Sequence, residues 1–533
     1  MTPRSLTPAA LAPTLEAACR RWPARPATTH DGVTISYAEL WERVSALADA
    51  YRSLGVPPGD RIVCQLPTCP AHLVAAHAAW ACGAVHVGAD NDLTGPELSL
   101  LVERTEASVL LFQPRPGASD PLAPLRPVTR DHPSTIVVVH GATPEDERHL
   151  SLEALLGTGA GTMAAKAEPA ELAPDDPALL FLTSGTTGTP KGVVETMAAL
   201  WAKVAYFADA FGPGPDDVHL MYLPISHAFG LKLSLAALLS GGRLVLVDRF
   251  SPGEALRLVS EERVSVLPGT PTHFTLLVNA LDPARHDLAS LRWAVAAAAA
   301  LAPPLLDQVY AKLGVELFYV YGCSEGFLVS TTERDEIYAG SVGRSVFRGP
   351  PGTPPDGSVA VVEPSDHTPL APGEVGEIVF GARQPGRYWG EAEVAAEGWY
   401  HTGDLGRIEG DGRLHVVGRL KELINRGGLK VAPGEVEAVL VRHPGVTDAG
   451  VIAMPDPVLG EAVCACVVPA GQPPPDLAEL RAFLAPDLAR HKLPDQLYLV
   501  EAIPRTKISK VDRAALRALV VDADAEPECL RPR

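Results

Sequence analysis

The stretch that decides the fold reads Thr183-Ser184-Gly185-Thr186-Thr187-Gly188-Thr189-Pro190-Lys191-Gly192. An apolar run over residues 178–182 leads into it and predicts a buried strand. Three glycines allow a tight turn with exposed N–H groups, while five hydroxyls and one lysine add donors that suit an anion. A Walker A loop is excluded, because Pro190 stands where that pattern requires its second glycine. We therefore interpret the stretch as a phosphate-binding loop rather than an ordinary surface turn.

Length and charge narrow the class of protein. A chain of 533 residues exceeds what one hydrophobic core supports, so we expect two or more domains. The net charge of −19 argues against nucleic acid and anionic membranes as partners, since both require a basic face. The N-terminus does not resemble a signal peptide, and the longest apolar run, 293–302, is too short to span a bilayer. These features favour a cytoplasmic enzyme.

The eight cysteines are scattered along the chain. Neither Cys64 and Cys69 nor Cys464 and Cys466 have the C-x-x-C spacing of a zinc site, and no histidine cluster accompanies them in the sequence. We expect these cysteines to be reduced, buried and apolar in their role.

Helical and strand patterns alternate through most of the chain. Apolar residues recur at helical spacing over 37–54 and 197–211. Alternation of this kind predicts parallel sheets covered by helices. A surface linker is expected over 157–176, a compact α+β unit over 420–520, and a disordered tail after Val521. Strands are predicted at 61–66, 178–182, 219–223, 243–247, 264–267 and 316–321.

Five further segments accompany the phosphate loop and carry polar or charged side chains beside tight turns. They are Leu223-Pro224-Ile225-Ser226-His227-Ala228-Phe229-Gly230, Tyr321-Gly322-Cys323-Ser324-Glu325-Gly326, Trp399-Tyr400-His401-Thr402-Gly403-Asp404, Gly418-Arg419-Leu420-Lys421-Glu422 with the following 425–437, and Pro504-Arg505-Thr506-Lys507-Ile508-Ser509-Lys510.

In this order and spacing, the six segments resemble the core motifs of the adenylate-forming superfamily. That family includes acyl- and aryl-CoA synthetases, the adenylation domains of peptide synthetases and the luciferases. The resemblance covers about residues 15–520, and the motifs are specific as a set although each alone is weak. It implies an α/β fold, with a large N-terminal domain of stacked sheets (1–419) and a small mobile α+β domain (420–533). Lys421 would lie at the hinge between them.

The resemblance implies ATP and Mg²⁺ as cofactors. Glu325 would hold Mg²⁺ with help from Thr186 or Thr187, since hard oxygen ligands suit this ion. Asp404 would accept the two ribose hydroxyls, Arg419 would lie over the ribose or phosphate, and Tyr321 would stack on adenine. The remaining nucleotide contacts would come from Thr183, Ser184, Gly185, Gly188, Thr189, Lys191, Ala298, Gly322 and Ser324.

Catalysis would depend on Lys510. By the resemblance, its ammonium group would bridge the attacking carboxylate and the α-phosphate, and would stabilise charge as pyrophosphate leaves. In a second half-reaction the small domain would turn Lys510 away and bring Gly427-Gly428 towards a thiol of coenzyme A or a carrier-protein phosphopantetheine. His227, in its Leu-Pro-x-x-His frame, is expected beside the substrate carboxylate or the thiol tunnel.

The segment after Pro224 indicates which class of carboxylic acid the enzyme would activate. Amino-acid-activating relatives generally place an aspartate there, whereas His227-Ala228-Phe229 carries no acid, which disfavours an α-amino acid. Ligases for 2,3-dihydroxybenzoate have an asparagine directly after the histidine, and Ala228 cannot read a 2-hydroxyl in that way. We expect Lys232 to be solvated. The pocket predicted by analogy is apolar and suits a flat ring; its residues are Ala228, Phe229, Leu233, Ala299, Val320, Cys323 and Leu328.

Three departures from the family pattern stand out. A run of alanines, Ala296–Ala300, replaces a Ser-Gly-Gly-Ala turn, and each added methyl narrows the approach of adenine and substrate. Ser324 replaces a threonine, and Ser509 replaces a glycine just before Lys510. None of the three removes a charged catalytic group, so we expect an active enzyme.

The leading hypothesis is adenylation of a benzoate-like or cinnamate-like acid and transfer of the acyl group to coenzyme A or a carrier protein. A medium-chain fatty acid is the second substrate class. Amide formation and diazotisation of an aryl amine with nitrite stay open as uses of the adenylate, and a luciferase-like role rests on fold analogy alone. A nucleotide-binding protein without turnover is disfavoured by the presence of Lys510 and Glu325. We expect a monomer or a homodimer.

Overall fold

The computed structural model describes most of the chain. Its described residues are 11–115, 117–144, 146–157, 170, 172–183, 191–210, 212–299, 301, 303–323, 328–344, 358–381, 387–389, 399–427, 429–505, 511–522 and 528–529. The predicted linker falls largely outside these ranges. Several candidate site residues also lie outside them: Ser184, Gly185, Thr186, Thr187, Gly188, Thr189, Ser324, Glu325 and Lys510.

The first sheet has eight strands, of which β4, β8, β3, β5, β6 and β7 run parallel. Antiparallel β9 and β18 extend it beyond β8. Its two faces are buried in different cores, because Ile62 and Cys64 point to one side of β3 and Val63 to the other. In order, the strands are β18 (Arg387–Tyr388), β9 (Lys191–Thr196), β8 (Pro177–Thr183), β4 (Val85–Gly88), β3 (Arg61–Gln65), β5 (Val109–Phe112), β6 (Ile136–Val139) and β7 (Leu150–Ser151).

The second sheet also has eight strands and a parallel centre, with β15 and β2 antiparallel at its edges. Its short apolar strands have the composition expected of a sheet that is covered on both faces. In order, they are β15 (Leu328–Thr331), β14 (Glu316–Gly322), β13 (Trp293–Ala296), β12 (Val266–Gly269), β10 (Val218–Met221), β11 (Arg243–Leu246), β1 (Pro26–His30) and β2 (Val33–Ser36).

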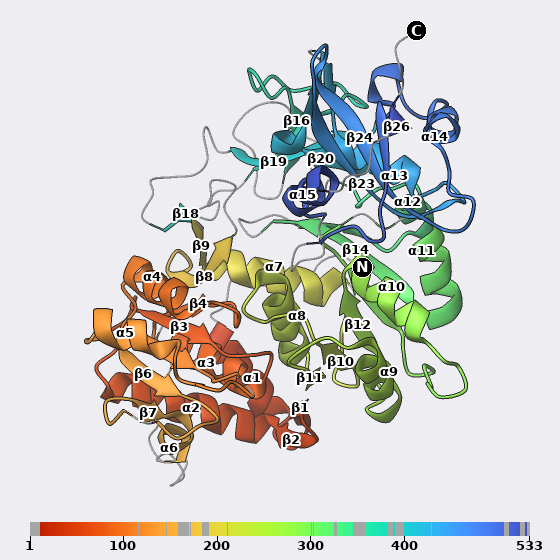
Figure 1. Ribbon diagram of the computed structural model, residues 1–533. Helices are drawn as coiled ribbons and strands as arrows, with labels where there is room; N and C mark the ends of the chain where they lie inside the picture. The colour runs from red at the N-terminus through yellow and green to blue at the C-terminus, as the bar shows by residue number, and fades with distance from the viewer. Residues whose placement is uncertain are drawn as a thin grey trace.

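Helices α3 (Pro70–Ala81) and α8 (Ala228–Leu239) occupy the region where the two sheets face each other (Figure 1). Ten of the twelve residues of α3 and nine of the twelve of α8 are buried. A helix that is apolar on all sides requires protein around its whole circumference. Accordingly α3 contacts β3 and β4 of the first sheet and β1 of the second, and one core cluster joins both sheets.

The other helices of the N-terminal part pack around these two sheets. Helix α2 starts at a capping box in which Ser36 and Glu39 satisfy each other's backbone N–H groups. Their bounds are α1 (Leu11–Arg21), α2 (Tyr37–Ser53), α4 (Gly95–Thr105), α5 (Leu125–Asp131), α6 (Leu152–Gly157), α7 (Met197–Ala210), α9 (Pro252–Glu261), α10 (Pro271–Ala280), α11 (Pro303–Gln308), the π-helical turn η1 (Val309–Leu313) and α12 (Arg334–Tyr338).

A third, antiparallel sheet follows, with β16 (Val359–Val362), β17 (Gly376–Gly381), β19 (Trp399–Ile408) and β20 (Leu414–Arg419) in that order. The short 3₁₀ helix η2 (Leu420–Glu422) then leads into the C-terminal unit, drawn in blue in Figure 1. Its sheet contains β22 (Leu429–Val431), β21 (Ile424–Arg426), β24 (Gly460–Pro469), β25 (Gln496–Leu499) and β26 (Glu528–Cys529), with β23 (Val446–Asp456) also paired to β24. Its helices are α13 (Pro433–Leu440), α14 (Leu477–Leu484), η3 (Arg490–Lys492) and α15 (Arg513–Asp522).

The predicted fold class is confirmed: two stacked α/β sheets precede a smaller α+β unit. The predicted helices over 37–54 and 197–211 and all six predicted strands are present, within two residues at most ends. Beyond Asp522, the described residues Glu528–Cys529 pair with β25. Seven cysteines have described side chains with free thiols, and all of these but the half-buried Cys323 are buried, as expected. Within the described chain, the helices lack the length and apolar character that crossing a membrane requires.

Buried histidines give the fold a pH dependence. Burial lowers the pKa of His77 and His219 to about 4, so each takes up a proton on unfolding between pH 6.5 and 4. A base with a depressed folded-state pKa loses its stabilising contribution as the pH falls through this window. We expect each histidine to cost about 2 kcal/mol of unfolding free energy at pH 5 relative to pH 7.5.

Urea unfolding of wild type and His77→Leu at both pH values measures this cost. The variant should lose less stability on acidification than the wild type does. Equal losses in the two proteins would contradict the assignment of His77 as an acid-sensitive group.

Candidate functional site

The candidate site forms where parallel strands end. The carboxyl ends of β14, β13 and β10 lie at one edge of the second sheet, and ligands of open α/β sheets bind at such an edge. Tyr321 and Gly322 are the last residues of β14, and Cys323 follows them. Ala298 and Ala299 follow β13, and His227 follows β10 as the N-cap of α8. The structure thus brings together three sequence-predicted segments at one edge.

Asp404 connects this edge to the third sheet. Its Oδ2 accepts a hydrogen bond of 2.8 Å from the Tyr321 hydroxyl, and its Oδ1 lies 2.8 Å from Nε of Arg419. A carboxylate has about four lone-pair sites, so two remain for further donors. The half-buried Tyr321 has a pKa well above its ordinary value because of desolvation and the adjacent Asp404, and it therefore stays a donor. Three residues from separate motifs form one polar cluster.

Glu377 holds the turn that presents Asp404. This buried carboxylate accepts a 3.0 Å bond from the backbone N–H of Gly403 and lies 2.8 Å from Nδ1 of His401. Gly403 has φ of +69°, a left-handed conformation that favours glycine. Sequence reasoning missed Glu377, whose position at the start of β17 gave no motif to notice.

Strand β14 separates two environments. Alternate side chains of a strand point to opposite faces. Tyr319 and Tyr321 point to one side, where their hydroxyls reach the Ala299 carbonyl at 3.3 Å and Asp404. Phe318 points to the other side, where its ring centroid lies 6.4 Å from that of Phe207 on α7. The two faces therefore offer one polar and one apolar surface.

The apolar face includes part of the predicted acid pocket. Val320 shares this face of β14 with Phe318, and the Phe229 ring of α8 lies 6.5 Å from the Phe207 ring. Leu233 is buried one turn further along α8, and Ala228 is half-buried at its first position. Phe207 was missed because nothing in the sequence relates α7 to α8. For Leu328, as for Thr183 and Lys191, the structure describes the backbone alone.

The alanine run departs from ordinary backbone geometry. Ala298 has φ of +77°, in the left-handed region where a Cβ atom costs about 1–2 kcal/mol. The sequence predicted an altered wall at this position, and the structure adds that the alanine keeps a conformation suited to glycine. Ala298 thus stores strain beside the end of β13.

Lys232 corrects a prediction. It was expected to be solvated, but only 3% of it is exposed, and its Nζ lies 3.0 Å from Oε2 of Glu195. Lys203 contacts the other carboxylate oxygen. Burial lowers the pKa of Lys232 to about 8; burial also raises that of Glu195, but the two ammonium groups outweigh this and leave it below its ordinary value. A buried triad of two lysines and one carboxylate therefore links α7 and α8 to β9.

The phosphate loop is framed by described strands. Thr183 at the end of β8 pairs with Lys191 at the start of β9, so the loop connects two adjacent antiparallel strands. This pairing places both ends of the loop side by side, at the carboxyl end of β8 and the amino end of β9. Phe181 lies two residues before the end of β8, and the centroid of its ring is 5.9 Å from Nζ of Lys232.

Comparison with known proteins identifies the family. A model for AMP-binding enzymes matches residues 15–387, and a model for the C-terminal domain of these enzymes matches residues 435–510. The chain belongs to the AMP-binding enzyme family. Members are adenylate-forming ligases, so the chain is an ATP-dependent enzyme that adenylates carboxylic acids. The resemblance predicted from the sequence motifs is confirmed.

Relatives within the family act on aryl acids. A salicylyl-CoA synthase / salicylate adenylyltransferase of Streptomyces sp is 35% identical over 92% of this chain and 90% of its own length. A feruloyl-CoA synthase of Amycolatopsis sp is 35% identical over 93% of this chain and 96% of its own length. Among solved structures, ATP-bound MatB of Rhodopseudomonas palustris superposes with a TM-score of 0.80 at 27% identity and covers 96% of this chain and 99% of its own.

The strain at Ala298 is open to test by substitution. We expect Ala298→Gly to raise the unfolding free energy by about 1 kcal/mol, because glycine adopts positive φ without a steric penalty. Ala296→Gly is the matched control: this alanine is buried in β13, and its replacement should be destabilising. Urea unfolding measures both variants, and a loss of stability in Ala298→Gly similar to that of the control would contradict the assignment.

Proposed function

We propose that the enzyme activates a benzoate-like or cinnamate-like acid and transfers the acyl group to coenzyme A or a carrier-protein phosphopantetheine. The observation that carries this proposal is the division of β14 into a polar face and an aromatic face. Adenylation requires a site for the ATP phosphates and a site for the acid. The two sites must lie so that the acid's carboxylate reaches the nucleotide. A strand with two such faces separates the two binding regions by the thickness of one backbone.

On the polar side, Asp404 is the proposed ribose ligand. Its two remaining lone-pair sites suit the two hydroxyls of a ribose; Tyr321 bonds this carboxylate, and Glu377 holds the backbone turn that presents it. Arg419 then supplies positive charge next to the nucleotide. Glu325 and Thr187, a carboxylate and a hydroxyl, are donors of the type that Mg²⁺ prefers, and the ion would neutralise charge on the triphosphate.

On the apolar side, we propose that an aryl ring lies against Phe229 and Val320. Phe207 packs near Phe229 from α7 with the two rings tilted by 45°, and aromatic side chains of this kind offer a surface on which a further ring packs well. The named relatives act on salicylate and ferulate, two acids with such rings. Glu195, the buried carboxylate that contacts α7 and α8, is already paired with Lys203 and Lys232 and so is not available to the ammonium of an amino acid.

We propose that Lys510 completes the site from the C-terminal domain. Lys421 lies in η2, directly after β20 and Arg419, where a short irregular segment joins two separately packed units. A rotation at this position would exchange the surfaces that the small domain offers to the site. The boundary between the domains is accordingly proposed at residues 419 and 420.

A pyrophosphate-exchange panel tests the substrate class. Benzoate-like and cinnamate-like acids should support the fastest exchange, and leucine should stay at background. Fastest exchange with leucine or a long-chain fatty acid would contradict the aryl assignment, whereas a medium-chain acid would favour the second substrate class.

The panel includes Lys510→Ala and a control in the same protein. Loss of the ammonium group should reduce exchange by about a hundredfold or more, as for other groups that stabilise developing charge. Lys312→Ala removes a lysine that bonds the Val278 carbonyl away from the site and should retain activity. Equal background rates in wild type and Lys510→Ala would favour a protein that binds nucleotide without turnover.

Tyr321→Phe tests the polar cluster separately. Loss of a hydrogen bond to a charged group costs about 1.5–3 kcal/mol, so KM for ATP should rise about tenfold or more while KM for the acid changes little. Tyr338→Phe removes a comparable tyrosine–aspartate bond, to Asp307 on the surface, and should leave both constants unchanged. Steady-state kinetics that showed the same effect in both variants would contradict a nucleotide role for Tyr321.

A further inference from the structure

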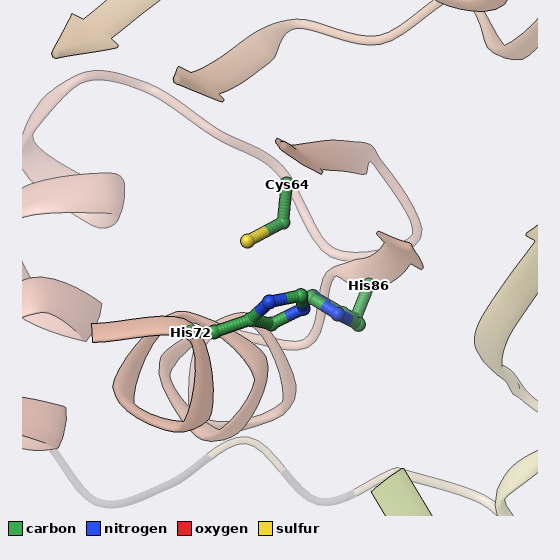
Figure 2. Close-up of side chains that lie close together, drawn as sticks. All are labelled: Cys64, His72 and His86. Carbon is green, nitrogen blue, oxygen red and sulfur yellow. The ribbon is translucent and has the colours of Figure 1, made fainter. Parts of the chain in front are cut away.

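Three potential metal ligands meet in the interior of the N-terminal part. The Cys64 Sγ, a His72 ring nitrogen and a His86 ring nitrogen all lie within 4.8 Å of one another, and all three residues are completely buried. Figure 2 shows the two imidazole rings side by side with the thiol next to them. The sequence predicted that no histidine cluster accompanies the cysteines, and for Cys64 this prediction is wrong.

The sheet register explains how the cluster forms. Cys64 of β3 pairs with Gly88 of β4, and Ile62 pairs with His86, so Cys64 and His86 point to the same face from neighbouring strands. Helix α3 covers that face, and His72 belongs to its first turn. The two ring centroids are 5.4 Å apart. Ligands 22 residues apart in the sequence thus converge because β3, α3 and β4 form one crossover unit.

Among the described residues, several ring nitrogens of the two histidines are buried without a hydrogen-bond partner, which is unusual in a protein core. His72 Nδ1 bonds the Leu66 carbonyl at 2.9 Å, which leaves its Nε2 with a lone pair. In the described structure this Nε2, and both nitrogens of His86, have no hydrogen-bond partner. An unsatisfied buried polar group costs about 1–3 kcal/mol, and a metal ion would satisfy such lone pairs.

We propose that Cys64, His72 and His86 bind one Cu(I) ion. A thiolate with two imidazoles is a set that soft transition-metal ions prefer. The Cys64 thiol would lose its proton to solvent on binding, and the resulting thiolate and Cu(I) would form a neutral unit. Zn²⁺ would leave one uncompensated positive charge and normally requires a fourth ligand.

The surroundings favour a neutral complex. The described groups that act on the three side chains are backbone atoms, Tyr51, Cys69, His77 and His227, none of which is a carboxylate or an ammonium group. Because an isolated charge is costly in such an apolar interior, a monovalent ion with one thiolate is the combination that burial tolerates best.

A bound ion would also rigidify the support of the candidate site. The loop between β3 and α3 bonds the segment that carries His227, through the Thr68 hydroxyl and the Leu223 carbonyl at 3.2 Å. Gly88 approaches the Ser226 backbone so closely that an added Cβ would lie 2.4 Å from its carbonyl oxygen. An ion that binds residues of β3, β4 and α3 would therefore restrain the elements that contact the segment carrying His227. The proposal stands independently of the substrate that the enzyme activates.

The test is an anaerobic titration of the full-length protein with Cu(I) against a colorimetric Cu(I) chelator. Wild type should withdraw one equivalent from the chelator, and Cys64→Val and His86→Leu should lose this ability. His77→Leu and Cys466→Val remove a buried histidine and a buried cysteine outside the cluster, and both should retain it. Circular dichroism verifies that each variant is folded.

X-ray absorption spectroscopy of the copper-loaded wild type provides a measurement without substitutions. One sulfur and two nitrogen neighbours around copper would support the site. The proposal is overturned if wild type withdraws no copper, if Cys64→Val binds as well as wild type, or if the absorption data show no sulfur neighbour. Tighter retention of Zn²⁺ than of Cu(I) by the same three residues would overturn the monovalent assignment.

Discussion

Burial of α3 and α8 on all sides is the constraint on which the structure depends. Two helices without a polar face cannot remain at a surface, and they bring two parallel sheets together around them. As a consequence, the carboxyl ends of strands from both sheets lie near the N-terminus of α8. Thr183, at the start of the phosphate loop, ends β8 of the first sheet, whereas His227 and Ala298 follow strands of the second and Tyr321 lies at the end of β14. The candidate site results from this packing.

The same burial raises the free-energy cost of ionisable groups in the interior, and the fold offsets this cost in different ways. Glu195 is stabilised by two lysines, whereas burial keeps His77 and His219 neutral because it disfavours the protonated ring. Ala298 retains a conformation that glycine would adopt more easily. Glu195 contacts α8 and Ala298 follows β13, the neighbour of β14, and these segments also carry candidate site residues. Stability and function therefore compete for the same segments.

The elements were largely predictable from the sequence. The apolar run before the phosphate loop, the helical spacing over 37–54 and the Trp399–Asp404 turn each depend on neighbouring residues, and short-range patterns report such structure well. The motif set likewise indicated the family and placed Tyr321, Asp404 and Arg419 in one site, where the structure gathers them. The elements thus followed from local patterns, whereas the shared site of these three residues was implied by the resemblance to the family.

Contacts between distant segments were decided by the tertiary structure. Lys232 is buried because β9 places Glu195 beneath α8, and Glu377 supports Asp404 because β17 pairs with β19. Cys64, His72 and His86 meet because strand register orients two of them towards the helix that carries the third. Sequence by itself determined which groups are available and which elements carry them. Their partners were fixed only when packing set the distances, since a side chain's charge state and role depend on what surrounds it.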